Sequence, residues 1–200
     1  MLIPKSYASC EQTIKGSRFL SELFPISSQA EVREKIKSQK QKYADSTHVC
    51  HAFICGKNAE LMGMSDDGEP GGTAGRPMLD VLKGSGATNL LVTITRWFGG
   101  TLLGTGGLVH AYGDGVKNVL AECDFEELVE KCVFDLKCDY QQYQVVKKIF
   151  ESFTLYDLSE DFGELISISG QIAEKDFESL KQTVFDSTNG KITVNVNHNF

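Results

Sequence analysis

Long apolar runs are missing from this sequence. No stretch approaches the roughly 18 apolar residues that a transmembrane helix requires. The N-terminal stretch MLIPKSYASCEQTIKGSRF also lacks the apolar segment of a secretory signal peptide. With 41% hydrophobic residues among 200, the composition is that of a globular protein with one large domain or two small ones. We therefore expect a soluble, cytoplasmic protein without a membrane partner.

The sequence also has no C-x-x-C spacing, although it contains six cysteines. Cys50 and Cys55 fall in a strand-like run. We expect free, buried thiols in a reducing compartment, and no disulfide-linked partner.

Several catalytic signatures are absent as well. There is no G-x-S-x-G elbow and no His–Glu metalloprotease motif, so hydrolase chemistry has no support. His48 and His51 are three residues apart in an apparent strand, so their side chains should point to opposite faces rather than share a metal. We predict no metal and no cofactor. A binding role is favoured over an enzymatic one, with catalysis left open.

Positive charge is scarce in the later part of the chain. Residues 1–120 carry 13 Lys/Arg against 11 Asp/Glu, a net charge of +2, whereas residues 121–200 carry 7 against 16, a net charge of −9. Phosphate binding needs clustered cations. A nucleic-acid partner is therefore expected to contact mainly the first part.

The residue pattern changes near residue 130, which predicts two domains, 1–130 and 133–200. In the second, VFDLKCD alternates apolar and polar residues as a half-buried strand does. A helix, two strands, a second helix and a last strand follow, at 140–153, about 154–159, 164–172, 173–184 and 191–197. This βαββαβ order predicts a ferredoxin-like domain.

The first domain is less regular. Strands are expected at 15–23, 48–56 and 88–100, and helices at 29–43, 73–83 and 108–123. Helices that cross over between strands favour an α/β domain with βαβ units. The helix at 29–43 should place Arg33, Lys37 and Lys40 on one exposed face. These three are candidates for nucleic-acid binding, and the alternative is a charged face that is only solvated.

DDGEPGGTAGRP, residues 66–77, is the first of two glycine-rich segments. A turn followed by a helix explains its glycines, with Thr73 as N-cap and Pro77 in the first helical turn. It does not explain the three neighbouring carboxylates, which repel one another and normally recruit an arginine, a metal or a cationic partner. Both a functional loop and a solvated turn remain open.

RWFGGTLLGTGGLVHAY, residues 96–112, is the second glycine-rich segment. It follows a strand and opens a helix, the position of a phosphate-binding loop. It lacks the Lys-Ser/Thr of a P-loop and the last glycine of G-x-G-x-x-G, which disfavours ATP hydrolysis and dinucleotide binding. An anion site at the helix N-terminus and a tight strand–helix joint both remain open. We expect residues 66–77 and 96–107 to lie side by side and to form one surface.

DDGEP, TAGRP, RWFGG and LGTGGL, in this order, resemble the Impact family in its bacterial, two-domain, YigZ-type form. KGSRF and HVCHAF fit the same pattern, so the resemblance covers most of residues 10–120. It implies a two-layer α/β first domain like a small-subunit ribosomal protein and domain IV of elongation factor G, followed by a ferredoxin-like domain. It also implies a link to translational control, without established catalytic residues.

The same motifs mark a surface of ligand-binding candidates. Its members are Asp66, Asp67, Glu69, Thr73, Gly75, Arg76, Arg96, Gly99, Gly100, Gly104, Gly106 and Gly107, with Pro70, Pro77 and Phe98 in the same motifs.

Three functions compete. The first is a non-enzymatic regulatory protein that associates with ribosomes or RNA. The second is a binder of a phosphorylated small molecule, or an enzyme acting on one, that uses Arg76, Arg96 and the amides of 104–107. The third is a protein-interaction module that uses the sheet of the second domain.

Overall fold

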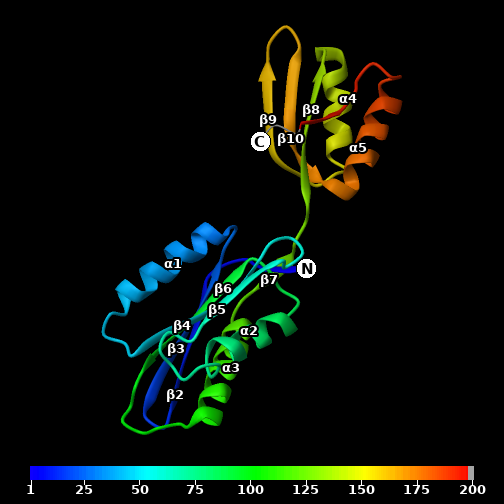
Figure 1. Cartoon of the computed structure of the whole chain (residues 1–200). Helices are drawn as coiled ribbons and strands as arrows, with labels where there is room; N and C mark the ends of the chain where they lie inside the picture. Colours follow the sequence, from blue (N-terminus) through cyan, green and yellow to red (C-terminus); the bar gives the residue numbers. More distant parts are fainter. Residues whose placement is uncertain (198–200) are drawn as a thin grey trace. The chain divides into compact units, whose positions relative to one another are not determined.

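The computed structural model describes residues 1–197 and divides the chain into two compact units, Met1–Leu128 and Val129–Phe200 (Figure 1). Each unit has its own main sheet and its own helices. None of the helices in the described residues is long and apolar enough to span a bilayer.

The first unit is built on a five-stranded sheet with the order β2-β3-β6-β4-β5 and antiparallel pairing throughout. Its strands are β2 (Ala8–Ile14), β3 (Ser17–Pro25), β4 (His48–Cys55), β5 (Leu61–Ser65) and β6 (Leu90–Trp97). The central strand β6 is buried from Leu90 to Arg96. The register places His48 opposite Arg96.

Helices cover both faces of this sheet (Figure 1). They are α1 (Gln29–Lys42), α2 (Gly75–Gly84) and α3 (Thr105–Ala121). Val32 of α1 packs in a cluster with Phe53 of β4, whereas Ala52 and Ile54 of β4 join the cluster formed by α2 and α3. Successive residues of a strand point to opposite faces. The unit therefore has three layers, where the resemblance implies two.

The connection through α1 is a split form of the predicted βαβ unit. Strands β3 and β4 are each antiparallel to β6, which lies between them. They are therefore parallel to each other, and α1 crosses between them over one face of the sheet.

A short two-stranded sheet closes the first unit. β1 (Leu2–Pro4) pairs with β7 (Phe125–Glu127) in antiparallel register. The Leu128 amide also donates to the carbonyl oxygen of Met1 (2.8 Å). The two ends of this unit are thus joined by backbone hydrogen bonds.

The second unit has the element order βαββαβ that the sequence predicts. The elements are β8 (Lys131–Cys138), α4 (Tyr140–Phe150), β9 (Leu155–Phe162), β10 (Ile166–Ala173), α5 (Glu174–Ser187) and β11 (Asn195–Asn197). The strand order is β11-β8-β10-β9, with antiparallel pairing throughout. The helices pack on the sheet through a core that includes Phe134, Val146, Ile168 and Leu180.

Candidate binding site

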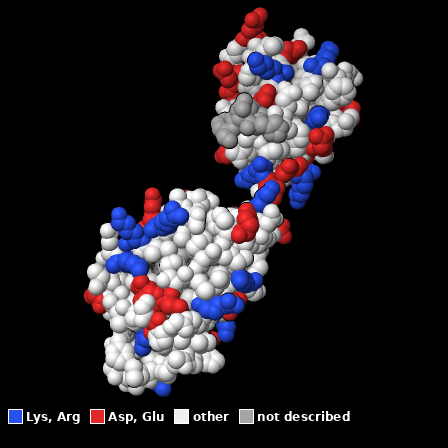
Figure 2. Space-filling view, viewed as in Figure 1, with Lys and Arg blue, Asp and Glu red and all other residues white. Residues whose placement is uncertain are grey.

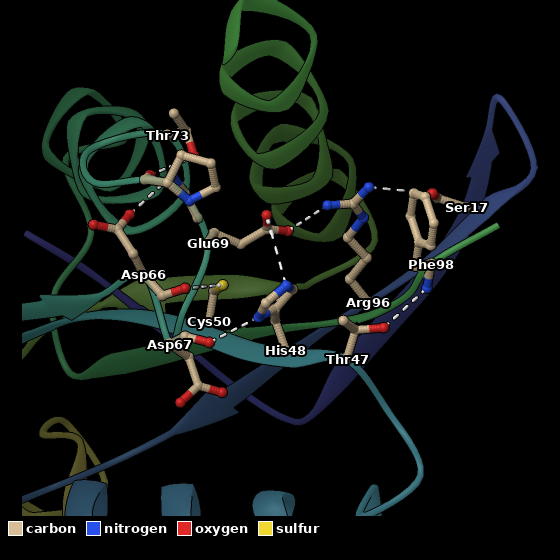
Figure 3. Close-up of polar contacts among 12 residues, drawn as sticks. Ser17, Thr47, His48, Cys50, Asp66, Asp67, Glu69, Thr73, Arg96 and Phe98 are labelled. Carbon is tan, nitrogen blue, oxygen red and sulfur yellow. Dashed lines mark hydrogen bonds and ion pairs between the residues drawn. The ribbon is translucent and has the colours of Figure 1, made fainter. Parts of the chain in front are cut away.

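The three carboxylates of the segment 66–77 do not crowd one another, because each has a different set of partners (Figure 3). Asp66 caps α2: its oxygens accept hydrogen bonds from the amides of Gly72 (2.9 Å), Ala74 (3.0 Å) and Gly75 (2.8 Å). Burial alone would raise the pKa of Asp66, but the three amide donors outweigh it and lower the pKa. The charged carboxylate also suits the positive end of the helix dipole.

Thr73 is not the N-cap that the sequence predicts. Ala74 holds the N-cap position and makes no side-chain cap bond. The hydroxyl of Thr73 donates instead to the carbonyl oxygen of Pro70 (2.7 Å). The prediction was wrong because the Asp66 carboxylate, eight residues before the cap position, already occupies the free amides.

Asp67 connects the loop 66–77 to β4 and α1. One carboxylate oxygen accepts from the Val49 amide of β4 (2.7 Å), and the other pairs with Lys40 of α1. Burial opposes ionisation, but these donors lower the pKa of Asp67.

Lys40 is therefore not the free cation that the sequence predicts. Arg33 and Lys37 are exposed and have no ion-pair partner among residues 1–197.

Glu69 is the centre of a buried network. The residue is 7% exposed, and its Oε1 accepts from Arg96 Nη1 (2.7 Å) and from the Tyr112 hydroxyl (2.7 Å). His48 Nε2 lies 3.8 Å from Oε2. Arg96 Nη2 also donates to Ser17 Oγ (3.3 Å). The loop, β3, β4, β6 and α3 thus meet at one ion pair (Figure 3).

His48 and Cys50 face the loop from alternate positions of β4. Because His48 Nδ1 lies 2.8 Å from the carbonyl oxygen of Asp67, which can only accept, Nδ1 carries the proton. The Cys50 thiol donates to the carbonyl oxygen of Asp66 (3.0 Å). Burial raises the pKa of Cys50 to about 12, so this thiol is not a thiolate nucleophile at neutral pH.

The two glycine-rich segments border one cavity of about 410 Å³. Glu69 and Pro70 line it from the first segment, and Arg96, Phe98, Gly104 and Thr105 line it from the second. The expected side-by-side placement of the segments is therefore present. Arg76 lies outside the lining and makes two 2.9 Å hydrogen bonds to the exposed Asp80.

Several motif positions require glycine for structural reasons. A Cβ on Gly99 would lie 1.9 Å from the backbone carbon of Gly16, and a Cβ on Gly75 would lie 2.9 Å from the backbone of Ser65. Gly104 has a φ of +78°, the left-handed region that favours glycine. A Cβ on Gly107 would touch Leu103. Gly106 differs, because a Cβ there would meet nothing within 4 Å.

Ser17, Cys50 and Tyr112 belong to the network but were not among the predicted site residues. The spacing of His48 and Cys50, two residues apart on one strand face, was the available signal for Cys50. Ser17 and Tyr112 reach Arg96 and Glu69 from 79 and 43 residues away, and no local pattern indicates such contacts.

This arrangement suits binding better than covalent chemistry. The carboxylates of Asp66, Asp67 and Glu69 are occupied by internal donors. In residues 1–197, no group of three His, Cys, Asp or Glu side chains is placed to hold a metal ion. What stays open to a ligand is the cavity between the two segments.

The chain was also compared with known proteins. The family model of the Impact N-terminal domain matches residues 15–120. An IMPACT family member of Haemophilus influenzae is 37% identical over 96% of this chain and 95% of its own length. The IMPACT family member YigZ of Escherichia coli is 31% identical over 86% of this chain and 92% of its own length. A crystal structure of a hypothetical protein, 28% identical, matches with a TM-score of 0.69 over 100% of this chain and 98% of that one.

Proposed function

This chain belongs to the Impact family, and from that membership we propose that it is a non-catalytic binding protein linked to translation, which contacts ribosomal RNA through the exposed face of α1. The observation that carries the proposal is the surface of that helix. Arg33 and Lys37 are exposed without ion-pair partners among residues 1–197, and with Ile36, Lys40 and Gln41 they border an open groove.

Basic side chains outnumber acidic ones on this helix. Figure 2 shows Lys and Arg side chains gathered over α1. The helix carries five basic residues and two acidic ones, and Glu31 is occupied by Ser27. Clustered cations without partners attract phosphate, because binding releases the counterions of the nucleic acid.

We also propose the ferredoxin-like fold for the second unit, because its antiparallel strand order β11-β8-β10-β9 and its βαββαβ connections suit that class. We also propose a cytoplasmic location, because all six cysteines are free thiols, as is usual in a reducing compartment.

Co-sedimentation with ribosomes tests the RNA contact. The variant is Arg33→Glu with Lys37→Glu, and Lys40 is left in place because its loss would break the pair with Asp67. The matched control is Lys5→Glu with Lys83→Glu, which changes the net charge equally at two other exposed lysines of the same unit. We expect weaker binding for the first variant only, with the slope of log K against log salt reduced by about two.

Two outcomes oppose the proposal. Equal co-sedimentation of the Arg33/Lys37 variant and the wild type at all salt concentrations would exclude a role for this face. Co-sedimentation that survives complete RNase digestion would indicate a ribosomal protein as the contact instead of RNA.

A further inference from the structure

We propose that the cavity between residues 66–77 and 96–107 binds a small organic anion, with its carboxylate or phosphate group at the N-terminus of α3 and its apolar body against Phe98 and Leu102. This site is separate from the basic face of α1. A cavity of about 410 Å³ is within the size range of small-molecule sites, which combine apolar walls with a few convergent polar groups.

The first support is the buried guanidinium that lines the cavity. Arg96 is 5% exposed, and it donates two hydrogen bonds, to Glu69 and to Ser17. A guanidinium has five N–H donors. The Nε atom is buried and has no hydrogen-bond partner among the described residues. A buried charged group with unused donors is costly unless a further acceptor joins it.

The second support is the open helix end on the same cavity. The N-cap of α3 is Gly104, which makes no side-chain cap bond. The first intrahelical bond runs from the Leu108 amide to the Gly104 carbonyl oxygen, so the amides of Thr105, Gly106 and Gly107 lack acceptors among residues 1–197. Such amides and the helix dipole favour an anion. The same fold fills the equivalent position of α2 with its own carboxylate, Asp66.

The third support is the apolar wall. Leu103 and Leu108 are buried at the cavity, while Phe98 and Leu102 are 46% and 81% exposed. The Phe98 ring centroid lies 5.6 Å from the guanidinium carbon of Arg96. An apolar or aromatic ligand body would therefore contact Phe98 and Leu102 next to the cation.

Glu69 is the group that opposes an anion here. Its Oε1 already accepts from Arg96 and Tyr112, and His48 lies near Oε2. The pair of Glu69 and Arg96 is neutral as a unit, so the α3 dipole and the three open amides set the preference for negative charge. Glu69 also holds the guanidinium in place.

The experiment is an NMR titration of the full chain that follows the amides of 105–107 and the Nε–H of Arg96. The probes are phenyl phosphate and phenylacetate, with inorganic phosphate and benzyl alcohol as partial ligands that lack the apolar body or the charge. The test variant is Thr105→Glu, and the matched neutral control is Thr105→Gln. Thr105 is exposed and lies at the first position of α3.

We expect saturable shifts of these resonances with one or both phenyl anions, and weaker binding of inorganic phosphate. Whichever phenyl anion binds more tightly identifies the headgroup as phosphate or carboxylate. Thr105→Glu should raise the dissociation constant about tenfold, because it places a second anion at the same amides. Thr105→Gln adds no charge and should therefore weaken binding clearly less than Thr105→Glu does. The glutamate should not lower the unfolding temperature, since a negative charge suits a helix N-terminus.

Three results would overturn the inference. The first is the absence of saturation by either phenyl anion. The second is an equal response to benzyl alcohol, which would leave only an apolar cavity. The third is equal affinity of the Glu and Gln variants. None of these results bears on ribosome binding through α1, so the two proposals can fail separately.

Discussion

Arg96 and Glu69 are opposite charges removed almost completely from water, with side chains that are 6% and 2% exposed. A buried ion pair contributes little net stability by itself, but loss of one partner leaves the other charge uncompensated. The Tyr112 hydroxyl donates to the same Glu69 oxygen as Arg96 does, and Ser17 Oγ accepts from a second guanidinium nitrogen. The pair thus holds Arg96 at the cavity and fixes the loop to β6.

A double-mutant cycle tests this coupling. Glu69→Gln and Arg96→Met should each lower the free energy of unfolding by about 3–5 kcal/mol. The double variant should lose clearly less than the sum, because no uncompensated charge remains. Urea unfolding measures all four proteins. Additive losses would mean that the two side chains stabilise the unit independently.

His51 is the second residue whose surroundings predict a measurable effect on stability. Burial lowers its pKa from 6.5 to about 4, with a further lowering by Lys40 and an opposing effect of Asp67. Its Nδ1 is buried and has no hydrogen-bond partner in residues 1–197. The folded protein therefore keeps His51 neutral where the unfolded chain would protonate it.

The sign of the pH dependence follows from that difference. Between about pH 6.5 and 4 the unfolded chain binds one more proton at this site, so the free energy of unfolding should fall as the pH falls. Urea unfolding of the wild type and His51→Gln across this range measures the effect. The variant should show a flatter profile. The lowered pKa values of Asp66 and Asp67 act at lower pH, below their ordinary value of 3.8. Parallel profiles would exclude His51 as the cause.

At the scale of elements, the start of α2 depends on a residue outside the helix. Asp66→Ala removes the acceptor of three amides and should destabilise the first unit by about 1–2 kcal/mol. Asp66→Asn keeps one acceptor oxygen and should lose less. Chemical denaturation gives the energies, and amide exchange at 72–75 locates them. An equal loss in both variants would show that the charge, rather than the number of acceptors, stabilises the helix.

The same elements show what the sequence could predict. Period-2 and helical patterns identify most strands and helices, including the βαββαβ order after residue 130, because these patterns depend on neighbours in the chain. The third layer of the first unit was missed, since no periodicity tells which face of the sheet α1 covers. His48 lies opposite Arg96 because of the register in which β4 pairs with β6. The residue pattern of a single strand does not predict that register. The partners of Asp67 and Glu69 lie 18 to 43 residues away in the sequence, whereas those of Asp66 are backbone amides 6 to 9 residues away. Neither kind of partner is visible in the local pattern of carboxylates.

At the scale of the whole molecule, the charge asymmetry is weaker than the sequence suggests. Four acidic residues of the acidic range 121–200 lie in the first unit. They are Glu122, Asp124, Glu126 and Glu127. Residues 1–128 then carry 13 Lys/Arg against 15 Asp/Glu, and residues 129–200 carry 7 against 12. RNA binding by the first unit would therefore depend on local clustering along α1 rather than on net charge.

The last prediction is that each unit folds without the other. Every residue of the two apolar clusters in the first unit precedes residue 126, and every residue of the second unit's cluster follows residue 131. The β1–β7 ladder also closes the first unit within residues 1–128. A fragment of residues 1–130 should therefore unfold cooperatively and reproduce the amide spectrum of the same residues in the full chain.

The second fragment should begin at 129, because β8 starts at Lys131 and the Glu174 amide donates to the carbonyl oxygen of Glu130 (2.9 Å). With about 70 residues it should fold with lower stability than the first, since small domains bury a smaller share of their surface. Limited proteolysis of the full chain should cut near 128–133, because Val129, Glu130 and Lys131 are exposed. A fragment 1–130 that stays unfolded until fragment 129–200 is added would show that the separate cores depend on each other.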